Sequence, residues 1–178
     1  MVKKLVIYNS KTGFTKKYAE WIAEGSAADI RTLKEAKRME LFKYEVIVFG
    51  SWCMGGSLAK LKWFANKLKS LQNKKVAIYA CGASPNESPE IDGFLKTGFA
   101  DEVFKNARVF YCQGGLNYNK MGIMSKTAMR IFAKMVNNKK DKTQAEEEMA
   151  KMICRSYDIT DRKYADEVVS WIEGASNS

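Results

Sequence analysis

Hydroxyl side chains and one glycine follow an apolar run near the start of the chain, in a spacing that suits a bound phosphate. The run Leu5–Tyr8 predicts a strand, and a helical pattern begins soon after it. A tight loop before a helix offers unpaired backbone N–H groups and the positive end of the helix dipole, so an anion can bind there without a metal. We therefore expect a single phosphate monoester on the loop formed by Ser10, Lys11, Thr12, Gly13, Phe14 and Thr15.

Several common chemistries are excluded by what the sequence lacks. One glycine is too few for the G-x-G-x-x-G loop of dinucleotide sites, and no G-K-[ST] follows for a nucleoside triphosphate. The chain has no histidine, the commonest general base and metal ligand. Its four cysteines lie far apart and form no C-x-x-C pair, so we expect reduced thiols and no metal site. Chemistry here needs a cofactor or another base.

A second candidate loop follows the apolar run at residues 44–50, which is typical of a parallel strand buried on both faces. The loop runs from Ser51 to Ser57 and contains an aromatic residue, a methionine and two glycines. Ligands of open α/β sheets bind at the carboxyl ends of such strands. Ser57 is expected to cap a helix that continues to about Leu71.

Five strand-like segments alternate with helical patterns, which predicts one α/β domain. The weak second segment is 29–33, and the last two are 75–81 and 107–112. Right-handed crossovers give a doubly wound, five-stranded parallel sheet with helices on both faces, and its natural strand order is 2-1-3-4-5. We expect a single domain over residues 1–178, with an extra helical segment at about 116–142.

The formal charge of +10 restricts the classes of partner. Nucleic acids, anionic membrane surfaces and acidic proteins all attract such a chain. No zinc finger, RNP pattern or recognition helix is present, so nucleic acid is not expected. No signal-peptide core and no run of 18 apolar residues occurs, so a soluble, cytoplasmic protein is expected.

The sequence from Ser10 to Thr15 resembles the first loop of the flavodoxin family, which follows [ST]-x-[TD]-G-x-T and holds the phosphate of FMN. This resemblance implies a flavodoxin-like fold with FMN as cofactor. It also implies that Trp52 stacks on the isoalloxazine ring with Met54 beside it, although Trp52 can instead pack on the following helix. The residues implied to surround the ring are Ser51, Trp52, Cys53, Met54, Gly55, Gly82, Ala83, Gln113, Gly114, Gly115 and Tyr118.

Later segments resemble a narrower branch, the quinone-linked protoporphyrinogen oxidases of the flavodoxin superfamily. These segments are a Gly-Gly-x-x-Tyr loop, a basic, methionine-rich helix at 124–136 and a turn at 157–161. The branch implies an FMN enzyme that passes electrons from a reduced tetrapyrrole to a quinone. The basic helix can rest on an anionic membrane, which would make the protein peripheral to it, or on porphyrin propionates. Alternatively, its apolar stripe packs on the domain.

Three interpretations of function stay open. The first is a flavodoxin-family redox protein that exchanges electrons with a partner protein through FMN. The second is an FMN-dependent oxidoreductase of the protoporphyrinogen oxidase type with a quinone acceptor. The third is a basic binding module that has lost FMN. No catalytic residue is identified, because the phosphate and ring loops are common to the first two interpretations. The basic charge separates this chain from soluble flavodoxin carriers, which are usually acidic.

Overall fold

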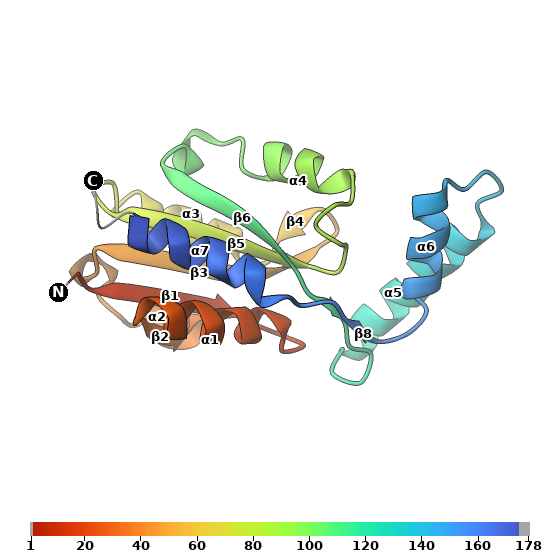
Figure 1. Cartoon of the computed structure of the whole chain (residues 1–178), viewed down its shortest axis with the longest axis horizontal. Helices are drawn as coiled ribbons and strands as arrows, with labels where there is room; N and C mark the ends of the chain where they lie inside the picture. Colours follow the sequence, from red (N-terminus) through yellow and green to blue (C-terminus); the bar gives the residue numbers. More distant parts are fainter. Residues whose placement is uncertain (1, 175–178) are drawn as a thin grey trace.

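The computed structural model describes residues 2–174 as an α/β domain with a helical arm at one end (Figure 1). The main strands run parallel in the order β2-β1-β3-β5-β6. This confirms the predicted doubly wound sheet, since β4 is only a short hairpin strand that shifts the later labels. The bounds are β1 (Lys4–Asn9), β2 (Asp29–Thr32), β3 (Val46–Met54), β5 (Lys75–Gly82) and β6 (Ala107–Gln113).

Helices cover both faces of this sheet because alternate residues of each strand point to opposite sides. Leu5 and Ile7 of β1 pack in one core cluster, whereas Val6 packs in the other. The first cluster includes side chains of α2 (Leu33–Ala36), η1 (Leu41–Lys43), α3 (Leu61–Leu68), α4 (Glu90–Gly98) and η2 (Glu102–Phe104). The second includes α1 (Phe14–Ser26) and α7 (Arg162–Gly174).

The chain turns back on itself at the end of β3, where a helix cap was expected. Met54 pairs with Ser57 of β4 (Ser57–Leu58), and the two glycines between them both have positive φ. Two left-handed residues in a row are typical of a tight hairpin turn. The predicted cap at Ser57 is therefore wrong, and α3 begins at Leu61 instead.

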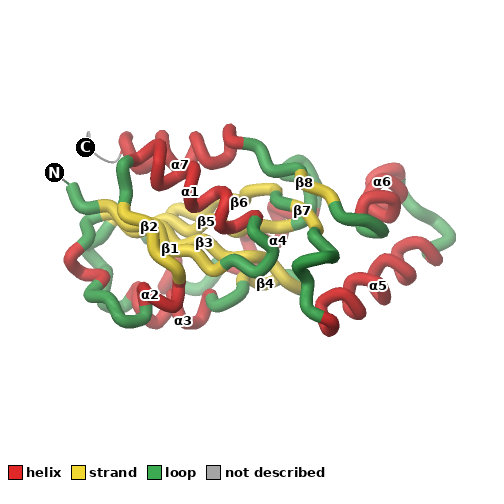
Figure 2. The backbone as a smooth tube through the Cα atoms, turned by 90° about the horizontal axis from the view of Figure 1, so that it is seen from below, coloured by secondary structure: helices red, strands yellow, loops and turns green. Residues whose placement is uncertain are grey.

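The arm, defined here as residues 117–156, leaves and rejoins the domain through a short ladder. In this ladder β7 (Gly115–Leu116) pairs antiparallel with β8 (Tyr157–Asp158). Between them lie α5 (Ile123–Asn138) and α6 (Gln144–Met152), which lie beyond the carboxyl edge of the sheet (Figures 1 and 2). The two helices share a small apolar cluster around Leu116, Ala133 and Ile153.

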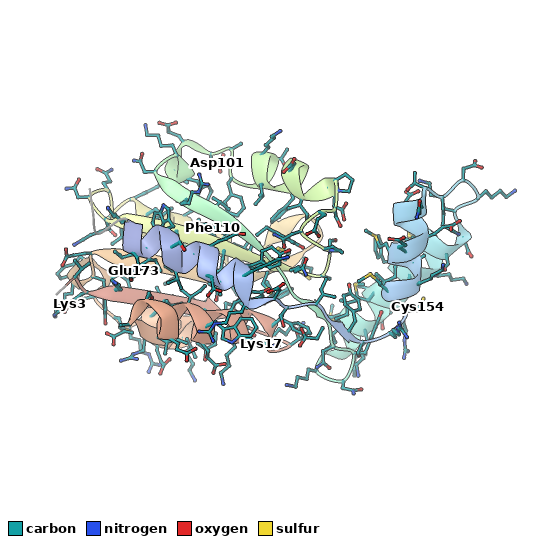
Figure 3. The ribbon with its side chains drawn as sticks, in the orientation of Figure 1. Lys3, Lys17, Asp101, Phe110, Cys154 and Glu173 are labelled. Carbon is teal, nitrogen blue, oxygen red and sulfur yellow. The ribbon has the colours of Figure 1, made fainter. Side chains whose placement is uncertain are left out.

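An ion pair holds the root of the arm against the first helix. Lys17 of α1 donates to Asp158 of β8 at 3.1 Å and to the Thr160 hydroxyl at 2.6 Å. Figure 3 shows Lys17 beside this root and Cys154 within the arm. Within residues 2–174, none of the helices has the length and apolar character needed to cross a bilayer.

Replacing Gly50 with alanine is expected to destabilise the fold. A Cβ at this position of β3 would stand 1.8 Å from a ring carbon of Tyr79, which is fully buried. The Tyr79 ring cannot retreat without breaking its hydroxyl contact to Thr15. We expect Gly50→Ala to lower the free energy of unfolding by about 2–3 kcal/mol, measured by urea denaturation.

Gly93→Ala is the matched control. Gly93 lies in α4, and nothing lies within 4 Å of an added Cβ there. Because alanine favours helix over glycine, this variant is expected to gain about 0.5–1 kcal/mol. Equal changes in the two variants would contradict the close packing of Gly50 on Tyr79.

Candidate functional site

The first loop places an uncapped helix N-terminus at the carboxyl edge of the sheet. Gly13 is the N-cap residue of α1 with a φ of 108°, and the helix has no side-chain cap. α2 and α6 each begin with a complete capping box, whereas α3, α4 and α5, like α1, have no side-chain cap. Ser10 Oγ accepts a hydrogen bond from Gly13 N at 3.2 Å, which closes the loop. The first N–H groups of α1 are therefore arranged to receive an external anion.

The other residues of this loop divide into outer and inner positions. Lys11 is exposed, and Thr12 is partly exposed. Phe14 packs on the core cluster beneath α1. Thr15 is buried, and its carbonyl accepts the Tyr79 hydroxyl at 2.9 Å. The Thr15 side chain therefore lies beneath the loop, whereas Lys11 and Thr12 lie on its outer side.

Two lysines lie at this loop, and one of them comes from the arm. Lys11 Nζ lies 5.3 Å from the centroid of the Trp52 ring and donates to Ser125 Oγ at 2.7 Å. Lys120 Nζ lies 3.8 Å from the point where a Cβ on Gly13 would stand. Sequence reasoning missed Lys120 and Ser125, because more than 100 residues separate them from the loop. The basic composition of the arm was the only signal that pointed to them.

The loop after β3 offers two side chains beside this anion-binding loop. Trp52 is partly exposed, and Met54 is exposed on the β3–β4 hairpin. Ser51 is instead fully buried, and its hydroxyl accepts a hydrogen bond from the Asn9 side chain at 2.9 Å. Cys53 pairs with Leu58 in the hairpin. Nothing lies within 4 Å of a Cβ added to Gly55, so the turn leaves its backbone accessible.

The loop after β5 is held in place by tyrosine hydroxyls. Tyr111 donates to the Ser84 carbonyl at 2.9 Å, and Tyr157 donates to the Ala83 carbonyl at 2.8 Å. A Cβ on Gly82 would stand 2.2 Å from the Tyr111 hydroxyl. The close approach of Tyr111 therefore requires glycine at position 82. The two tyrosine hydroxyls hold the backbone of this loop at Ala83 and Ser84.

The last residue of β6 and the two glycines after it contact other parts of the domain. Gln113 donates to the Ile159 carbonyl at 2.7 Å and accepts from Asn86 N at 2.9 Å. A Cβ on Gly114 would stand 2.8 Å from Cys81 Sγ, and one on Gly115 would stand 2.1 Å from the Tyr157 carbonyl oxygen. These three residues therefore hold β5, β6 and β8 together.

Tyr118 faces the arm. Its hydroxyl donates to the Ile153 carbonyl at 2.5 Å, and its ring packs on the apolar cluster shared by α5 and α6. The structure thus brings together the loops at 10–14 and 52–56, with Lys120 and Ser125 added, and directs Tyr118 elsewhere.

The thiols near this edge are held in the neutral form. Burial raises the pKa of Cys53 to about 12, and it also raises the pKa values of Cys81 and Cys112. A neutral thiol is a poor nucleophile. No group of cysteine and acidic side chains within residues 2–174 is arranged to hold a metal ion. The thiols at this edge therefore do not supply a thiolate nucleophile.

Comparison with known proteins gives one family match and several similar structures. A family model described as a flavodoxin domain matches residues 5–144. Similar structures include a flavodoxin from the domain Archaea (17% identity, 97% of this chain and 99% of that chain, TM-score 0.45). The Trp repressor binding protein from Bacillus subtilis is 16% identical over 79% of this chain and 100% of its own, with a TM-score of 0.49. No curated protein sequence matches the chain.

Thiol labelling tests the burial at this edge. In the native protein at pH 8, a chromogenic disulfide reagent should react rapidly with Cys154, which is exposed on the arm. Cys81 and Cys112 should react slowly because they are buried, and Cys53, which is partly exposed, should react slowly because its raised pKa keeps the thiol protonated. Cys154→Ser should remove the rapid phase, and denaturant should release all the thiols. Rapid labelling of Cys53 would contradict the raised pKa of its thiol.

Proposed function

The chain belongs to the flavodoxin domain family, and from this premise we propose that it binds FMN at the carboxyl edge of the sheet and transfers electrons through it. The observation that carries the proposal is the uncapped N-terminus of α1, with Lys11 and Lys120 beside it. When bound, FMN supplies the redox chemistry, and the protein supplies binding, orientation and electrostatics.

The groups at the first loop fit a phosphate monoester. The N–H groups of the first turn of α1 and the hydroxyls of Ser10 and Thr12 are hydrogen-bond donors, and the two lysines add positive charge. Charge-assisted hydrogen bonds to a phosphate are stronger than neutral ones. Gly13 keeps the approach open because it has no side chain, and its positive φ favours glycine at this position. Lys11 and Lys120 would thus neutralise most of the charge of the phosphate.

The groups of the second loop fit a flat aromatic ring. Trp52 offers an aromatic face, Met54 offers an exposed thioether, and the turn at Gly55 offers backbone groups without a side chain in the way. Lys11 lies near the Trp52 face, so its charge is close to where such a ring would stack. Positive charge at this point favours the more negative, reduced state of the site.

A second candidate function is an FMN-dependent oxidoreductase of the protoporphyrinogen oxidase type with a quinone acceptor. The observation that favours it is the arm, whose basic and apolar side chains begin at Lys120, next to the first loop. A carrier needs a redox partner protein. An oxidoreductase of this type would instead oxidise protoporphyrinogen by itself when given a quinone.

Removing Lys120 tests the phosphate contact. We expect Lys120→Ala to weaken FMN binding about five- to tenfold at low salt and to leave riboflavin binding unchanged, since riboflavin has no phosphate. Quenching of flavin fluorescence measures both affinities. Lys134→Ala, which removes a lysine further along α5, is the matched control and should bind FMN as the wild type does. Equal losses for both flavins would contradict a contact to the phosphate.

Stepwise reduction of the FMN-loaded protein without oxygen tests the proposed function and separates the two candidates. Accumulation of a species with one added electron, followed in the visible spectrum, is expected for a carrier. Direct passage to the two-electron form would favour the oxidoreductase, and turnover of protoporphyrinogen with a quinone would then be measured. A wild-type protein that binds neither FMN nor riboflavin would overturn the proposed function and leave a basic binding module.

A further inference from the structure

One side of α5 exposes large apolar side chains to solvent. Of the eight large hydrophobic residues that are exposed within residues 2–174, five lie on this helix. They include Ile123 and Met124, which are 85% and 87% exposed, and Met135, which is 67% exposed. We call the set the α5 stripe, and its members are Ile123, Met124, Ile131, Phe132 and Met135.

The stripe is separate from the side of α5 that folds the arm. Met129, Ala133 and Val136 pack with Met149 and Ile153 in the small apolar cluster of the arm. At 100° per residue, Met124, Ile131 and Met135 fall within a narrow sector of the helix, and the packed residues fall on another side. The arm therefore completes its own packing and still presents a second apolar side.

Basic side chains accompany this stripe. Residues 120–142 contain seven lysines and arginines and one acidic residue, Asp141. Within the described part of the chain, Lys126, Arg130 and Lys134 form no ion pair with a carboxylate. Arg130 and Lys134 lie beside the stripe by helical spacing, and their long stems can lie along apolar surface while the charge stays in water.

The positive charge of α5 and of the whole chain distinguishes between three possible partners for the stripe: a second copy of the chain, a nucleic acid and a lipid bilayer. A second copy of the chain would bring two proteins of formal charge +10 together. In a two-fold pairing through the stripe, it would also place basic residues against each other. A nucleic acid would match the lysines but would leave the isoleucine, methionine and phenylalanine side chains unused. A bilayer that contains anionic lipids accepts apolar side chains at the acyl boundary and lysines at the phosphates.

The length of α5 decides how it would meet a bilayer. The helix has 16 residues, so it is about 24 Å long, shorter than a hydrocarbon core of about 30 Å. An amphipathic helix of this kind lies in the plane of the interface.

We propose that α5 is an interfacial anchor, which binds anionic lipid surfaces by inserting its stripe between the headgroups. Because Ser125 in the first turn of α5 contacts Lys11, the anchor holds the first loop close to the lipid surface. The lipid contact itself does not depend on a bound cofactor.

Co-sedimentation of the full chain with lipid vesicles tests this inference. The protein should bind vesicles of phosphatidylcholine with about 30% phosphatidylglycerol, should not bind phosphatidylcholine alone, and should dissociate at high salt. The triple variant Met124→Ser, Ile131→Ser and Met135→Ser should reduce the partition coefficient at least about tenfold. Phe42→Ser is the matched control, because Phe42 is exposed on the domain rather than on the arm, and it should bind as the wild type does.

A variant without the basic side chains separates the electrostatic contribution to vesicle binding from the apolar contribution. Lys126→Gln, Arg130→Gln and Lys134→Gln together should weaken binding and flatten its dependence on salt, since fewer lipid phosphates are then neutralised. Circular dichroism checks that each variant is folded.

Several results would overturn the anchor. One is a folded wild type that binds neither vesicle. Another is equal binding to neutral and anionic vesicles. A third is a dimer that the serine triple variant abolishes, which would assign the stripe to a second copy. These outcomes are independent of flavin binding, which is measured in separate titrations.

Discussion

A buried hydrogen bond fixes the position of the first loop, and the candidate site depends on it. The Tyr79 hydroxyl donates to the Thr15 carbonyl at 2.9 Å from within the sheet, where the ring occupies space that Gly50 leaves free. A phenol buried in this way needs a partner, because an unpaired buried hydroxyl costs free energy. The contact therefore ties the first turn of α1 to β5 and keeps its N-terminus at the edge of the sheet.

A second tyrosine extends this anchoring to the other end of the chain. The Tyr18 hydroxyl donates to the Gln113 carbonyl at 2.6 Å and accepts from Asp161 N at 3.1 Å. It thereby joins α1 to the end of β6 and to the start of α7. Burial is the main cause that raises the pKa of Tyr18, so the phenol stays protonated and keeps its donor. The hydrogen bonds that position α1 and its first loop on the sheet are therefore neutral, and salt screens them little.

The sheet could be predicted from the sequence because its strands other than β2, whose sequence is only weakly strand-like, contain apolar runs with recognisable loops after them. The first loop was equally clear, since Gly13 and the surrounding hydroxyls are local in sequence. Other features depend on tertiary contacts that no local pattern reveals. The resemblance to flavodoxins places Tyr118 among the ring loops, whereas its hydroxyl donates to the Ile153 carbonyl in the arm. Lys120 reaches the first loop only because the arm folds back.

The short ladder between β7 and β8 brings the two ends of the arm side by side. Leu116 pairs with Tyr157 and Gly115 with Asp158, so the chain departs from the domain and returns to it about 5 Å apart. An insertion with adjacent ends can be lengthened, shortened or exchanged without altering the parallel sheet. The arm is thus a module that evolution can vary independently of the core, and relatives with the same sheet are free to carry arms of different length and chemistry.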